Sequence, residues 1–201
     1  MIPNRSVKMH KAHQMPTSKS GPFSNPLYTG QADKAIINLR GDAEDPSFLK
    51  AVQEALNMPL PIAACGTLAT SKIRVIWVGP NDWFVIGPQG EQANIEDKLR
   101  IALAGQHCAV TDVSSGYFLV TLSGLQAREV LAEACPMDFH PAVFKPGKAV
   151  GTNFFKISTY LWQLDETPTF EILVRRSFID HFWQLIEHCS TEFGWTPCQA
   201  A

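Results

Sequence analysis

The sequence predicts an α+β fold of antiparallel sheets with helices packed on one face. Strand-like runs come in pairs around turns rich in Gly, Asn and Asp, and an amphipathic stretch follows each pair. This strand-strand-helix unit recurs about three times without repetition of individual residues, an order typical of antiparallel rather than parallel sheets. No GxGxxG follows a strand and no GxxxxGK[ST] occurs, which argues against a parallel nucleotide-binding sheet.

Composition limits the class of protein. The 201 residues are 45% hydrophobic and 18% charged, enough for one large domain or two small ones with a substantial core. The net charge of -2 argues against binding to nucleic acid or to an anionic membrane surface. The five cysteines form no CxxC and no run of about 18 apolar residues occurs, so we expect a cytoplasmic protein with reduced thiols.

Three segments are expected along the chain. Residues 1–33 are rich in Ser, Pro, Gly, Lys and His, with no acidic residue before Asp33, and read as a flexible N-terminal arm. This arm is either a disordered tail or a strap that orders against a partner. The α+β domain spans 34–190, with two subdomains of about 34–134 and 135–190 as an alternative, and 191–201 form a C-terminal tail.

In the first half, residues 36–39 read as a strand, and Asp45 and Pro46 supply the cap and the first residue of a helix. Residues 72–77 and 83–86 predict a hairpin around a Gly-Pro-Asn-Asp turn. A helix over 91–104 follows. A second strand pair is expected, 108–113 with 117–122.

In the second half, a helix over 123–134 ends at Cys135-Pro136. Residues 150–158, 161–164 and 169–174 return to strand patterning. The last helix is expected to begin at Ser177, which has the capping-box spacing to Asp180, and to bury an aromatic stripe that includes Phe178.

A search for catalytic patterns assigns no catalytic, cofactor-binding or metal residue. There is no GxSxG and no HExxH, and the six histidines are scattered. The run 135–141 contains Cys, Asp and His, but the prolines at both of its ends favour a packed connecting loop. Asp112, at a strand end beside a Gly-containing turn, could face a ligand, although capping of the turn is the simpler interpretation.

Four residues are candidates for contact with a partner protein. The pair Arg175 and Arg176 precedes the last helix and could bind a carboxylate, a phosphate or an acidic patch. Trp83 lies beside a turn and Trp162 in a strand-rich region, so either could be an aromatic anchor at a subunit boundary.

A family resemblance lies in the order and spacing of several segments, which together span residues 36 to about 188. The segments are 37–42, 45–48, 79–83, 111–114, 122–124, 135–141 and 169–178. Together they resemble the gamma-subunit family of heterotetrameric sarcosine oxidase.

The resemblance implies a non-catalytic gamma subunit of a complex that oxidatively demethylates sarcosine to glycine, with tetrahydrofolate as one-carbon acceptor. It implies alpha, beta and delta subunits as partners, and FAD, FMN, NAD, zinc and tetrahydrofolate on those partners rather than on this chain. The implied fold is similar to the folate-binding module of the glycine-cleavage T-protein. The alternative is a stand-alone T-protein-like folate-binding protein or one-carbon transferase in which Asp112 recognises the pterin.

Overall fold

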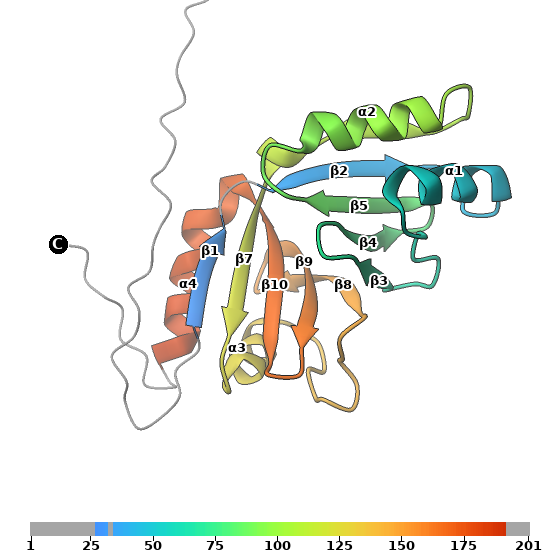
Figure 1. Cartoon of the computed structure of the whole chain (residues 1–201). Coiled ribbons are helices and arrows are strands. Elements are labelled where there is room, and N and C mark those ends of the chain that lie inside the picture. Colours follow the sequence, from blue (N-terminus) through green and yellow to red (C-terminus); the bar gives the residue numbers. More distant parts are fainter. Residues whose placement is uncertain (1–26, 32–33, 192–201) are drawn as a thin grey trace, which may run out of the picture.

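The computed structural model describes residues 27–31 and 34–191, and contains two five-stranded antiparallel sheets with a helical layer on each (Figure 1). Sheet 1 has the strand order β3-β4-β5-β2-β6, and sheet 2 has the order β1-β7-β10-β9-β8. Every strand pairing is antiparallel, which confirms the predicted fold class. No helix in the described ranges is long and apolar enough to cross a membrane.

Sheet 1 comes from one continuous part of the chain. Its strands are β2 (Ala35–Arg40), β3 (Thr67–Ala69), β4 (Arg74–Gly79), β5 (Asp82–Gly87) and β6 (Ala109–Asp112). Helices α1 (Pro46–Leu56) and α2 (Gln92–Ala102) pack on its outer face, around a core that includes Phe48, Val52 and Leu99. The predicted cap of α1 is confirmed, since the Asp45 carboxylate accepts a hydrogen bond from the Ser47 N–H at 2.8 Å.

Sheet 2 combines a strand from near the N-terminus with the second half of the chain. Its strands are β1 (Leu27–Gln31), β7 (Tyr117–Ser123), β8 (Ala149–Phe154), β9 (Ile157–Asp165) and β10 (Thr169–Arg175). Helices α3 (Ala127–Ala134) and α4 (Ile179–Thr191) cover its outer face. The expected N-terminal arm therefore contains one strand, β1, while residues 1–26, 32–33 and 192–201 lie outside the described part of the chain.

The inner faces of the sheets meet in a third core. It contains side chains from both sheets, and the largest are Trp162 and Phe84. A charged contact joins the sheets beside this core: Arg74 of β4 lies 3.8 Å from the Glu171 carboxylate of β10, which also accepts a 2.7 Å hydrogen bond from the Trp162 indole. The two sheets thus pack as a single unit, with helices only on their outer sides.

One predicted strand pair is wrong. β6 and β7, which cover the predicted strands 108–113 and 117–122, belong to different sheets: β6 pairs with β2, and β7 pairs with β1 and β10. The 3-10 helix η1 (Ser114–Gly116) separates them, and the Ser114 hydroxyl accepts a 2.9 Å hydrogen bond from the Ile36 N–H, which keeps the chain on sheet 1 up to this point. The chain therefore passes from sheet 1 to sheet 2 at Ser114–Gly116. This point lies before residue 134, where the alternative division into two subdomains places the boundary.

Three further boundaries differ from the sequence prediction. The helix expected over 123–134 begins at Ala127, and the strand expected over 150–158 is interrupted at Phe155, where φ is 51°. The last α-helix begins at Ile179 because a 3-10 helix, η2 (Arg176–Phe178), precedes it without a side-chain cap, so the predicted capping box does not form. Phe178 is 47% exposed and does not join the buried stripe.

The loop 135–141 is packed, as predicted. Cys135 and Phe139 are buried, and the Phe139 ring meets the rings of Phe144 and Phe170 edge to face. The Arg128 guanidinium donates to the Phe139 carbonyl and holds the loop against α3. The loop therefore completes the core of sheet 2.

Candidate binding surface at the seam of the two sheets

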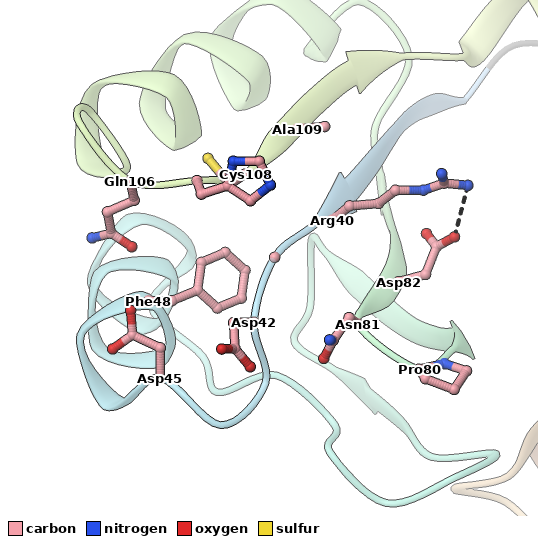
Figure 2. A pocket seen from close by; sticks show the side chains of 12 residues that line it. Arg40, Asp42, Asp45, Phe48, Pro80, Asn81, Asp82, Gln106, Cys108 and Ala109 are labelled. Carbon is pink, nitrogen blue, oxygen red and sulfur yellow. Dashed lines mark ion pairs between the residues drawn. The ribbon is translucent and has the colours of Figure 1, made fainter.

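Two adjoining hollows lie at the end of β2 and the start of β5, and the second of them reaches sheet 2. The first, with a volume of about 820 Å³, opens at the end of sheet 1 (Figure 2). The second, about 480 Å³, lies between the two sheets. Arg40 and Asp82 line both hollows, so their ion pair forms the ridge between them.

These hollows bring together segments that are far apart in sequence. Five of the segments that carry the family resemblance line one hollow or the other: 37–42, 45–48, 79–83, 111–114 and 169–178. Local chain geometry explains part of this arrangement, because the register between β2 and β5 places Arg40 opposite Asp82. The motifs therefore mark a surface in space and are not only turns.

The first hollow is shaped by an aromatic side chain and by turn contacts. Figure 2 shows Phe48 between the 40–45 turn and the loop that carries Gln106 and Cys108. The polar groups of Asp42 and Asn81 are engaged in backbone contacts: Asp42 accepts from the Glu44 N–H and Asn81 from the Ala43 N–H, each at 2.9 Å. The side-chain oxygen of Gln106 is buried without a hydrogen-bond partner among the described residues.

The second hollow combines charged and aromatic groups. One Asp82 oxygen accepts a 2.6 Å hydrogen bond from the Asn38 amide, and the other lies 3.0 Å from the Arg40 guanidinium. Tyr117 and Tyr160 each meet the Phe84 ring edge to face at a centroid distance of 5.3 Å. The hollow therefore has an aromatic wall and a polar rim.

The Tyr160 hydroxyl lies within the field of the rim charges. Burial raises the pKa of Tyr160 above its ordinary value, with smaller upward contributions from Tyr117 and Asp82, while Arg175 and Arg40 pull it downward. The phenol is therefore neutral at physiological pH and can donate a hydrogen bond.

The side chains around the two hollows are suited to binding. In the described ranges, no group of three or more His, Cys, Asp and Glu side chains lies close enough to hold a metal ion. The hollows are lined by guanidinium, phenol, amide and carboxylate groups, which bind through hydrogen bonds and charge, and the first hollow is also lined by His107 and Cys108.

Asp112 caps a turn. Its carboxylate accepts hydrogen bonds from both the N–H and the hydroxyl of Ser114. Asp112 is exposed at the edge of the second hollow, but these bonds hold one of its oxygens inside the turn. The geometry thus agrees with the simpler interpretation of this residue.

The two predicted arginines have different roles. Arg175 is exposed on the rim of the second hollow, with its guanidinium 5.5 Å from the centroid of the Tyr117 ring. Arg176 donates to the carbonyls of Ser115 at 2.9 Å and Tyr117 at 3.2 Å, and so ties η2 to the crossing between the sheets. Arg175 remains a candidate for partner contact, whereas Arg176 has a bonding role within the chain.

The structure corrects the prediction for the two tryptophans. Trp83 and Trp162 are both fully buried, so neither presents a surface to a partner. The Trp83 indole donates to the Pro61 carbonyl at 2.8 Å, and the Trp162 indole to Glu171. Each ring fills a core because its polar N–H finds an acceptor there.

Sequence reasoning missed three residues of the surface. Arg40 and Asp82 lie in two of the segments that carry the family resemblance. Their ion pair follows from the register between β2 and β5, which the sequence does not reveal. Tyr160 gave no signal, because its place at the seam depends on the packing of β9 against sheet 1.

Comparisons with known proteins agree on one family. The sequence model of the sarcosine oxidase, gamma subunit family matches residues 40–192. The chain is 33% identical over 149 residues to the sarcosine oxidase subunit gamma of Corynebacterium sp. (strain P-1), covering 73% of this chain and 71% of that one. It is 33% identical over 120 residues to the sarcosine oxidase subunit gamma of Arthrobacter sp., covering 60% of this chain and 58% of the relative.

Two solved structures share the fold. A chain of the heterotetrameric sarcosine oxidase from Corynebacterium sp. U-96, in complex with pyrrole 2-carboxylate, superposes with a TM-score of 0.78 at 26% identity, covering 86% of this chain and 87% of that one. The glycine cleavage system aminomethyltransferase T from Bartonella henselae superposes with a TM-score of 0.60 at 15% identity, covering 82% of this chain and 46% of that protein. The second likeness concerns the fold alone, and agrees with the T-protein-like architecture expected from the sequence.

Proposed function

Because the chain belongs to the sarcosine oxidase gamma subunit family, we propose that it is the gamma subunit of a heterotetrameric sarcosine oxidase. The observation that carries the proposal is the superposition on a chain of such an enzyme over 86% of this chain and 87% of that one, with a TM-score of 0.78. A match over nearly the full length of both chains supports an equivalent place in an equivalent assembly.

We propose that the complex oxidatively demethylates sarcosine to glycine, with tetrahydrofolate accepting the one-carbon unit. The partners are alpha, beta and delta subunits, and FAD, FMN, NAD, zinc and tetrahydrofolate reside on them. This chain then acts without catalytic residues of its own. It supports the reaction by covering apolar surface on its neighbours and by excluding water from a partner's site.

The surface formed by the two hollows, here called the seam surface, supports a binding role. It presents Arg40, Arg175, Tyr117 and Tyr160 around two connected hollows, groups that recognise a partner through directed hydrogen bonds. A subunit without its own reaction needs such a surface to hold its place in an assembly.

The stand-alone folate-binding alternative has less support. Its candidate pterin-recognition group, Asp112, is bonded to Ser114 in a turn. The likeness to the aminomethyltransferase concerns fold, and fold alone does not carry a ligand. Folate binding by a chain that elutes alone would support this alternative.

The test is affinity purification of the tagged chain at native expression level from its own host. Mass spectrometry identifies co-eluting chains, and flavin absorbance and sarcosine-dependent activity report on the complex. We expect three partner chains to co-elute, with a flavin spectrum and sarcosine-dependent activity. A colourless chain that elutes alone and shows a thermal shift with folate would overturn the proposal in favour of the alternative.

A further inference from the structure

The second hollow is rich in hydrogen-bond donors that the chain itself does not use. Arg175 forms no ion pair with a carboxylate of the described residues, and its guanidinium lies over the face of the Tyr117 ring. Within the same ranges, the hydroxyls of Tyr117 and Tyr160 form no hydrogen bond. A guanidinium and two phenols therefore face one hollow with free donors.

Most acceptor oxygens of this hollow are engaged in contacts within the chain. Asp82 accepts from Asn38 through one oxygen and pairs with Arg40 through the other. Asp112 receives both the N–H and the hydroxyl of Ser114. The two arginines and two aspartates balance in charge, but the donors of Arg175, Tyr117 and Tyr160 outnumber the acceptor left over, which is the second oxygen of Asp112.

An excess of donors beside a cation fits a carboxylate. Guanidinium binds a carboxylate in a bidentate manner, and a phenol adds a short charge-assisted bond to the same oxygen. A cationic ligand would compete with Arg175, and a neutral apolar ligand would leave the donors unsatisfied.

A free small carboxylate is a weaker fit than one carried by a protein. Arg175 is exposed, and an ion pair between exposed groups contributes at most about 1 kcal/mol in water. Only an occupant that brings surrounding surface excludes enough water to strengthen the pair. The adjoining first hollow of about 820 Å³ extends the concave face across the Arg40 ridge and suits such a surface.

We propose that the second hollow receives an Asp or Glu side chain of a partner subunit, held by Arg175 and the hydroxyls of Tyr117 and Tyr160. This inference rests on the proposed function, since it assumes that a partner subunit exists. Phe84 forms the apolar base of the hollow and excludes water below the pair. Residues 1–32 of the chain's own N-terminal arm contain no Asp or Glu, so they do not supply the occupant.

The test uses the whole complex, purified through a tag on this chain, with Arg175→Glu, Arg175→Lys and Tyr160→Phe. Arg175→Glu is expected to lower the affinity for the partner subunits at least tenfold, because it sets two carboxylates against each other. Arg175→Lys should lower the affinity less than Arg175→Glu, since lysine keeps the positive charge but cannot bind a carboxylate in a bidentate manner. Tyr160→Phe keeps the ring and removes one donor, with an expected loss of a few fold.

The matched control is Lys98→Glu on the exposed face of α2, which makes the same charge change away from the seam. It should assemble like the wild type. Thermal melting of each purified chain reports folding, and Tyr160→Phe provides an answer even if Arg175→Glu does not fold.

A photo-crosslinking amino acid at Ser115, which lies exposed on the rim, identifies the occupant. The expected product joins this chain to a partner peptide that contains Asp or Glu. A crosslink to Glu192 or its neighbours in the chain's own tail would overturn the inference, as would full assembly of a folded Arg175→Glu variant. In both cases the wild-type chain still captures its partners, so the proposed function stands; if it captures none, the proposed function fails instead.

Discussion

Replacing Glu171 by leucine tests the charged contact that joins the two sheets. The Glu171 and Arg74 side chains are only 15% and 21% exposed, and the same carboxylate accepts the indole N–H of buried Trp162. Glu171→Leu removes the acceptor of a buried donor and leaves the Arg74 cation without its carboxylate. Losing a charged hydrogen bond costs about 1.5–3 kcal/mol, and breaking a buried ion pair costs about 3–5 kcal/mol.

The Arg74–Glu171 distance of 3.8 Å and the partial exposure of Arg74 place this pair at the lower end of that range. We therefore expect a loss of about 3 kcal/mol in the free energy of unfolding, or roughly 6–12 °C in Tm for a chain of this size. Burial lowers the pKa of Arg74, and the Glu171 charge partly opposes that shift. The guanidinium is thus a desolvated cation for which the carboxylate compensates.

Urea unfolding of the purified chain, followed by tryptophan fluorescence and circular dichroism, measures the loss. Glu171→Gln is the matched control, because it keeps an oxygen for the Trp162 indole and removes only the charge, with an expected cost of about 1 kcal/mol. In a double-mutant cycle, Arg74→Met should cost less in the Glu171→Gln background than in the wild type. A change below about 0.5 kcal/mol for Glu171→Leu would refute the reasoning.

Three other perturbations follow from the structure. Gly41→Ala places a methyl group against the Phe48 ring and should lower stability by about 1–3 kcal/mol; Gly116→Ala, which meets open space, is the control, and equal Tm values would contradict the packing argument. Burial, aided by Cys189, raises the pKa of Cys135 to about 12, so iodoacetamide at about pH 9 should leave Cys135 unmodified in the native chain while half-buried Cys65 and Cys108 react; rapid Cys135 alkylation, read by mass spectrometry, would show that the core opens. Because the pKa of Tyr160 is raised in the folded state, the unfolded chain loses its proton first and stability falls above about pH 10. Tyr160→Phe removes this contribution, so its stability relative to the wild type should rise between about pH 9 and pH 11 in denaturant titrations, and parallel curves would argue against the shift.

The sequence predicted what depends on neighbouring residues. Asp45 and Pro46 begin α1 because capping and a fixed φ act within one turn, and the β4–β5 hairpin follows from the turn composition between its strands. The buried face of α3 also followed from helical spacing, with Ala127, Val130, Leu131 and Ala134 all buried.

The features that were missed depend on contacts between distant residues. β6 and β7 look like a hairpin in sequence, and only the bond from Ile36 to Ser114 shows that they part. The sequence leaves open that Trp83 or Trp162 is an anchor at a subunit boundary, because their acceptors, Pro61 and Glu171, lie on other segments of the chain. The seam surface requires the packing of sheet 2 against sheet 1, which no local pattern specifies.

The strand order also sets a sequence of events during synthesis. All five strands of sheet 1 lie within residues 35–112, so all of them emerge from the ribosome before any of β7 to β10 does. β1 must wait, since its partner β7 follows the whole of sheet 1 and pairs Leu27 with Ser123. The inner face of sheet 1, with Ile36, Ile76 and Phe84, is buried in the folded chain but is exposed to solvent until sheet 2 has formed. This apolar face is therefore where a nascent chain is open to aggregation.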